Sequence, residues 1–144
     1  MIEKDTIRLL RECDAGIKMG VDSIDDVLDD VSDTQFRKVL SDCRDEHEKL
    51  STEIKSLLDE YGDEGKDPDP MAKGMSWIKT NAKMAWDGSD STIADLMTDG
   101  CNMGVKSLSK YLNQYKAASE KTKDIAKKLI SVESTLSADM RQYL

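Results

Sequence analysis

Residues 19–24 read Met-Gly-Val-Asp-Ser-Ile, and residues 103–108 read Met-Gly-Val-Lys-Ser-Leu. In both copies another glycine stands four residues before the glycine of the repeat, at Gly16 and at Gly100. Apolar residues continue on both sides of each copy at spacings of three and four, which is the spacing of one face of a helix. The sequence therefore predicts two copies of one helical segment.

The helix that follows each copy extends the similarity. Residues 36–61 place apolar side chains on one face, and a shift of 82 residues pairs Cys43 with Ile125 and His47 with Leu129. The predicted inward positions of this second helix are Phe36, Leu40, Cys43, His47, Leu50, Ile54, Leu57 and Tyr61. The chain is thus predicted to contain a duplicated helical hairpin within a single domain, residues 1–144, because 144 residues suit one core.

The two hairpins, residues 5–61 and 91–144, are joined by a long crossover, residues 62–90. The crossover carries the apolar pattern of a short fifth helix, and it is long enough to return over the full length of a bundle. The second helix would then run parallel to the first helix of the other hairpin. This predicts an all-α, ferritin-like four-helix bundle, with a plain up-down-up-down bundle as the alternative.

Several short motifs also resemble an uncharacterised bacterial family of ferritin-like four-helix bundles. They are Cys13 with Gly16, Gly62, the run Trp77-Ile78-Lys79, and Cys101 with Gly104 followed by Tyr111, and they span roughly residues 9–116. The resemblance implies a bundle with a helical crossover and no established activity. Members of the family often carry acidic residues after the second glycine, where this chain has Val105 and Lys106, and this difference counts against a metal site inherited from the family.

Composition excludes several classes of partner. The 29 acidic and 21 basic residues give a net charge of −8, which disfavours nucleic acid because phosphates would be repelled. No apolar stretch approaches the ~20 residues that span a bilayer, and the acidic N-terminus does not resemble a signal peptide, so a cytoplasmic protein without membrane contact is expected. The three cysteines, Cys13, Cys43 and Cys101, are widely spaced and are expected to be reduced core thiols, with a redox switch or a nucleophile as the alternative.

Asp14 and His47 occupy positions where the helical pattern calls for apolar residues. Counting from the predicted turn places them within about one helical turn, ~6 Å, of each other. A hydrogen-bonded pair would satisfy both, since a buried unpaired carboxylate is costly. The alternatives are a mononuclear metal site, a ligand pocket, or one side chain in solvent. A dimetal centre is not expected because the chain has a single histidine, and no cofactor is predicted.

The repeated glycines lie inside predicted helices, where each costs about 1 kcal/mol relative to alanine. Gly20 and Gly104 therefore indicate a close contact, either between the two repeated helices or beneath Trp77 and Trp86. A flat ligand in the same groove is the alternative. The weak candidates for ligand binding are thus Asp14, His47, Gly20, Gly104 and Trp77.

Two functions remain. The first is a non-enzymatic bundle that acts by association, as a homodimer or with a partner protein, because Met-rich and aromatic helix faces offer more apolar surface than a small bundle buries. The second is a degenerate ferritin-like protein that binds a metal or a small ligand.

Overall fold

The computed structural model describes residues 2–68 and 89–144. Within these ranges it contains four long helices, α1 (Ile2–Val27), α2 (Thr34–Glu60), α5 (Asp90–Gln114) and α6 (Glu120–Met140), and two short 3-10 helices, η1 (Leu28–Asp30) and η2 (Arg141–Tyr143). The described part of the chain has no strand, so the all-α class is confirmed. No helix within the described ranges is sufficiently long and apolar to cross a membrane.

Three of the four long helices are preceded by a capping residue. Its side chain accepts a hydrogen bond from a backbone amide of the first turn. Asp33 accepts from the Phe36 amide at 2.9 Å, and Ser89 and Ser119 accept from the amides of Thr92 and Thr122. Such caps satisfy amides that have no partner inside the helix. Helix α1 begins at Ile2, three residues before the predicted start of the first hairpin.

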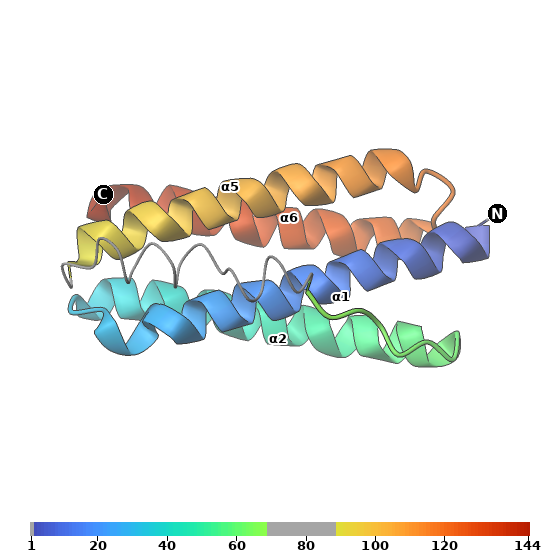
Figure 1. Cartoon of the computed structure of the whole chain (residues 1–144), viewed down its shortest axis with the longest axis horizontal. Coiled ribbons are helices and arrows are strands. Elements are labelled where there is room, and N and C mark those ends of the chain that lie inside the picture. Colours follow the sequence, from blue (N-terminus) through green and yellow to red (C-terminus); the bar gives the residue numbers. More distant parts are fainter. Residues whose placement is uncertain (1, 69–88) are drawn as a thin grey trace.

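Figure 1 shows α1 and α2 running antiparallel, as do α5 and α6. Helices α2 and α5 run in the same direction, so α2 ends and α5 begins at opposite ends of the bundle (Figure 1). This is the direction expected for a long crossover. The short helix predicted in the crossover falls mainly on residues 69–88, which lie outside the described residues.

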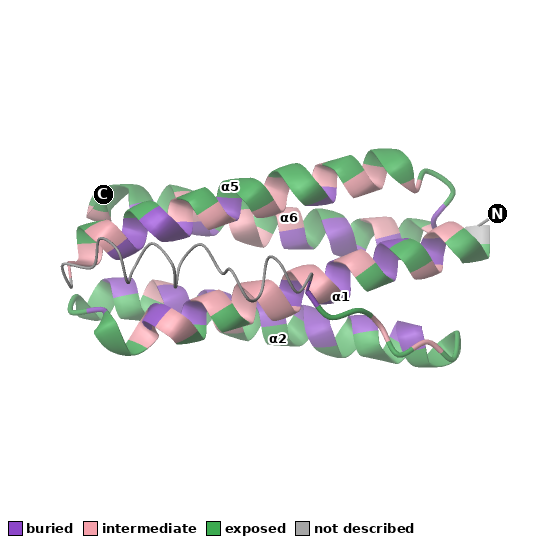
Figure 2. Ribbon diagram, in the orientation of Figure 1, coloured by how far each residue is buried: buried purple, intermediate pink, exposed green. Residues whose placement is uncertain are grey.

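Buried residues form an apolar interior along the axis of the bundle (Figure 2). One cluster lies near the turn between α1 and α2 and includes Ile24, Val31, Phe36, Leu40, Ile93, Leu136 and Met140. The other lies toward the opposite end and includes Leu9, Leu10, Ile17, Ile54, Leu58, Ile125 and Leu129. The buried polar residue His47 lies on the stretch of α2 between these two clusters.

Candidate functional site

The repeated glycines of α1 and α5 face the same space. They line a cavity of about 300 Å³ between the two helices, together with side chains from α2 and α6. The lining includes the four glycines Gly16, Gly20, Gly100 and Gly104, and the α6 residues Leu129, Glu133 and Leu136. The two copies of the sequence repeat therefore lie on opposite walls of the cavity. Each wall has two positions without a side chain.

Most of the other lining side chains are apolar. They include Met19, Ile24, Met97, Met103, Leu108 and Tyr111. A volume of about 300 Å³ is at the lower end of the range for small-molecule pockets, which are concave, mostly apolar and furnished with a few polar groups. The cavity has the size and the lining of a ligand site.

The deepest polar group of the cavity is a pair formed by His47 and Glu133. His47 Nε2 lies 2.7 Å from Glu133 Oε1, and His47 Nδ1 lies 2.8 Å from the carbonyl oxygen of Cys43. Both acceptors lack a proton to donate when Glu133 is ionised, so the imidazolium, with two N–H donors, satisfies both contacts at once. The side chain of His47 is 1% exposed and that of Glu133 is 13% exposed, so this is a nearly buried ion pair.

The surroundings of His47 stabilise its charged form. Burial alone would lower the pKa of His47, but the hydrogen bonds with Cys43 and Glu133 and the negative charge of Glu133 outweigh burial and raise this pKa to about 10. With both ring nitrogens engaged, the imidazole has no free lone pair at neutral pH. It is therefore a fixed donor and not a general base.

Gly20 is the glycine that this pair requires. A Cβ at position 20 would lie 2.6 Å from His47 Nε2, whereas the nearest atom of the described residues to a Cβ at Gly104 would be Glu133 Oε2, at 3.7 Å. The expected close contact is thus found at Gly20. At Gly104 the described residues leave space that belongs to the cavity, and the alternative contact beneath Trp77 and Trp86 falls on residues outside the described ranges. Gly20 on α1 leaves room for the imidazole ring, and Gly104 on α5 borders the cavity.

The cysteines are free and buried among the described residues. Burial raises the pKa of the Cys13 thiol to about 12 and also raises the pKa of Cys101, with nearby carboxylates adding to the effect. A thiol must ionise to act as a nucleophile, so these two are poor nucleophiles.

The predicted hydrogen bond between Asp14 and His47 is wrong. Both side chains are buried, at 3% and 0% exposure, but each has other partners. His47 packs at the level of Gly20, six residues beyond Asp14, which is roughly 9 Å along α1. Asp14, on α1, instead contacts the segment that follows α2.

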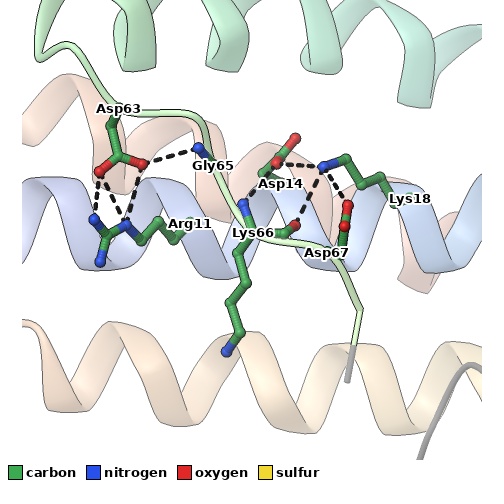
Figure 3. Close-up of polar contacts among 7 residues, drawn as sticks. All are labelled: Arg11, Asp14, Lys18, Asp63, Gly65, Lys66 and Asp67. Carbon is green, nitrogen blue, oxygen red and sulfur yellow. Dashed lines mark hydrogen bonds and ion pairs between the residues drawn. The ribbon is translucent and has the colours of Figure 1, made fainter. Parts of the chain in front are cut away.

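Residues 63–67 cross α1 and are fixed to it by polar contacts (Figure 3). Asp14 Oδ2 accepts a hydrogen bond from the Lys66 amide at 3.0 Å and pairs with the Lys18 ammonium at 2.9 Å. Asp63 pairs with Arg11, and Asp67 pairs with Lys18. The buried carboxylate of Asp14 is thus explained by the attachment of this segment.

Metal binding receives no support from the described residues. No group of three or more His, Cys, Asp or Glu side chains in the described ranges could hold a metal ion. Trp77, the remaining predicted ligand-binding residue, lies outside these ranges.

Sequence reasoning missed Glu133. The apolar spacing of the last helix favours Val132 as an inward position, together with Leu129, Leu136 and Met140, and Val132 is half-buried. The run Leu129, Glu133, Leu136, Met140 keeps helical spacings of four, three and four equally well, and it was the signal that could have identified the glutamate.

Comparisons with protein-family models, with curated proteins and with solved structures found no match to this chain.

Proposed function

We propose that this protein is a non-catalytic bundle that binds one small, mostly apolar molecule in the cavity between α1 and α5. The observation that carries the proposal is the cavity itself: about 300 Å³, lined by apolar side chains and four helical glycines, with a buried ion pair at its floor.

The glycines support the proposal energetically. Each costs about 1 kcal/mol relative to alanine inside a helix, and among the described residues an alanine Cβ at Gly16 or Gly104 would meet only ordinary contacts. Packing within the described part of the chain therefore does not account for the absence of a side chain at these two positions. An occupant of the cavity would account for it.

The non-catalytic character rests on the state of the reactive groups. His47 has both nitrogens engaged, and burial suppresses ionisation of Cys13 and Cys101. These groups bind and exclude water but are not poised for proton transfer or nucleophilic attack.

The proposed architecture is a ferritin-like bundle built from two copies of one hairpin. It is supported by the common direction of α2 and α5 and by the equivalent placement of the repeated glycines on facing walls. A cytoplasmic location stays a prediction, supported by the free thiols.

Association with a second protein receives less support from the described residues. The large hydrophobic side chains exposed there are Tyr61, Met103 and Leu144, which lie at the end of α2, in the middle of α5 and at the C-terminus. They do not form one patch. Association as a homodimer or with a partner stays a prediction.

Protein-observed NMR with benzene, the smallest flat apolar probe, tests the proposed function. We expect the amide signals of Gly20, Gly104 and Glu133 to shift in a saturable manner. A Gly104→Leu variant should lose the response, because the leucine fills the cavity. The control Asn102→Leu adds the same side chain at an exposed position of α5 outside the cavity and should respond like the wild type. Shifts that are absent, or that survive Gly104→Leu, would refute the proposal.

A further inference from the structure

The charged side chains that line the cavity neutralise one another. Lys66 Nζ lies 2.6 Å from Glu12 Oε1, and His47 Nε2 lies 2.7 Å from Glu133 Oε1. These four are the charged residues among the described residues of the lining, and each has its opposite within the same lining. A charged ligand would bring an uncompensated charge into a mostly apolar space, and such burial is costly. The cavity therefore favours a neutral molecule.

The volume limits the size of the molecule. A closed apolar cavity of about 150 Å³ binds benzene, so about 300 Å³ accommodates roughly two aromatic rings. The walls favour a flat shape, because Gly16 and Gly20 on α1 face Gly100 and Gly104 on α5. Because glycine has no side chain, the two helix backbones form a flat slot at these positions.

The side chains around the slot suit an aromatic molecule better than an aliphatic one. Among the described residues, Met19, Met97 and Met103 line it together with Tyr111. Thioether sulfurs make favourable contacts with aromatic rings and adapt to their outline. Offset stacking with Tyr111 would add to these contacts.

One acceptor remains for a ligand. His47 engages Oε1 of Glu133, and the Cys101 thiol also interacts with this carboxylate. A carboxylate offers about four acceptor positions, so the described residues leave at least one. The second oxygen, Oε2, lies 3.7 Å from the position that a Gly104 Cβ would occupy, which is the open side of the slot. A hydroxyl or an N–H on the ligand can donate there.

We infer that the ligand is a neutral, planar molecule of about two aromatic rings that donates one hydrogen bond to Glu133. This inference rests on the proposed function, and it names the chemical class of the molecule that the cavity takes.

Calorimetric titration of the full chain at pH 7 with four matched probes tests the inference. The probe 2-naphthol has the inferred features. Naphthalene lacks the donor, 2-naphthoate carries a negative charge, and decahydro-2-naphthol keeps the skeleton and the hydroxyl but is not planar. We expect 2-naphthol to bind at least about tenfold more tightly than each of the other three.

Two variants locate the binding. Gly104→Leu should abolish binding of 2-naphthol, and Asn102→Leu should leave it unchanged. Replacing the polar pair together, as His47→Leu with Glu133→Leu, avoids stranding one charge and should reduce the preference for 2-naphthol over naphthalene to less than about twofold.

The outcomes separate this inference from the proposed function. Equal binding of 2-naphthoate or of decahydro-2-naphthol would overturn the ligand class, and equal binding of naphthalene would overturn the hydrogen bond to Glu133. A response to benzene without any binding of 2-naphthol would also overturn the class while the proposed function stands. If none of the probes binds, benzene included, both the ligand class and the proposed function would be overturned.

Discussion

At the level of single residues, Gly20 and Gly104 hold equivalent places in the repeat but have different neighbours. A Cβ at position 20 would come within 2.6 Å of the His47 ring, which is fixed by two hydrogen bonds. A Cβ at position 104 would find ordinary contacts only with the residues that the structure describes. The sequence repeat alone predicted the same role for both.

We expect Gly20→Ala to destabilise the fold by about 1–3 kcal/mol, because the imidazole must move and its buried hydrogen bonds weaken. Gly104→Ala should instead stabilise by up to about 1 kcal/mol through its higher helix propensity. Chemical denaturation measures both. The control is Gly16→Ala, whose Cβ would lie 3.9 Å from Leu129 and which should behave like Gly104→Ala. Equal effects at positions 20 and 104 would contradict this prediction.

His47 should be energetically coupled to Glu133 and not to Asp14. His47→Leu or Glu133→Leu alone strands a partner and should cost about 3–5 kcal/mol, while the double variant should recover much of the loss. Asp14→Leu combined with His47→Leu should be additive within about 0.5 kcal/mol, because the two have separate partners. Double-mutant cycles by urea unfolding give both coupling energies. Coupling between Asp14 and His47 would show that the placement of His47 is wrong.

The protonated state of His47 makes stability depend on pH. Its pKa is about 10 in the folded protein and ordinarily 6.5, so its contribution is fully present below pH 6.5 and is lost as pH rises through 10. Between pH 6.5 and 8.5 the free energy of unfolding should fall, with a slope of up to about 1.4 kcal/mol per pH unit. His47→Leu should lack this part of the slope. Identical pH profiles of the two proteins would exclude a buried imidazolium.

At the level of elements, the segment after α2 depends on two glycines in the left-handed region, Gly62 at φ 64° and Gly65 at φ 85°. Their surroundings differ, because a Cβ at Gly62 would meet none of the described residues within 4 Å, whereas a Cβ at Gly65 would overlap the carboxylate of Asp14. The first glycine ends α2, and the second lets the segment lie against α1.

Gly62→Ala should therefore cost about 1–2 kcal/mol, the penalty of the left-handed conformation alone. Gly65→Ala should cost clearly more, since it adds displacement of Asp14 from the Lys66 amide. Thermal unfolding of the two variants gives the comparison. Equal melting temperatures would mean that the contact between Asp14 and this segment is not maintained.

The helices differ in how well their buried faces could be predicted. In α2, seven of the eight predicted inward positions are buried, and Tyr61 at its C-terminal end is the exception. In α1, buried residues follow one another on adjacent faces, as at Leu9 and Leu10 and at Cys13 and Asp14. Helix α1 contacts α2, α5 and α6 together, so its buried face is wider than one apolar stripe.

At the level of the whole molecule, hydrogen bonds join the two hairpins at both ends of the bundle. At one end the amides of Ser32 and Asp33 donate to Asp90, each at 2.8 Å. At the other end the Ser119 amide donates to Thr6 Oγ1 at 2.8 Å, and the Ala117 amide donates to Asp5. These contacts fix the register of one hairpin against the other.

Thr6→Val keeps the shape of the side chain, which is nearly fully buried, but removes the acceptor for the Ser119 amide. We expect a loss of about 1–2 kcal/mol, because the partly buried Ser119 amide is left without its partner. The control is Thr52→Val, at an exposed position on α2, where the change should stay within about 0.5 kcal/mol. A Thr6→Val variant as stable as the wild type would show that the hydrogen bond from Ser119 to Thr6 contributes nothing to stability.

The sequence by itself determined the helical class, the approximate helix ends and the glycine repeat, because apolar spacing and capping residues act over one or two turns of the same helix. It also indicated that Asp14 and His47 are buried. Their partners were decided only by the tertiary structure. A difference of six residues along α1 moves a side chain by roughly 9 Å, and whether His47 reaches Glu133 or Asp14 depends on how α2 and α6 are placed against α1. The cavity likewise exists only where two glycine-bearing walls from distant parts of the chain face each other.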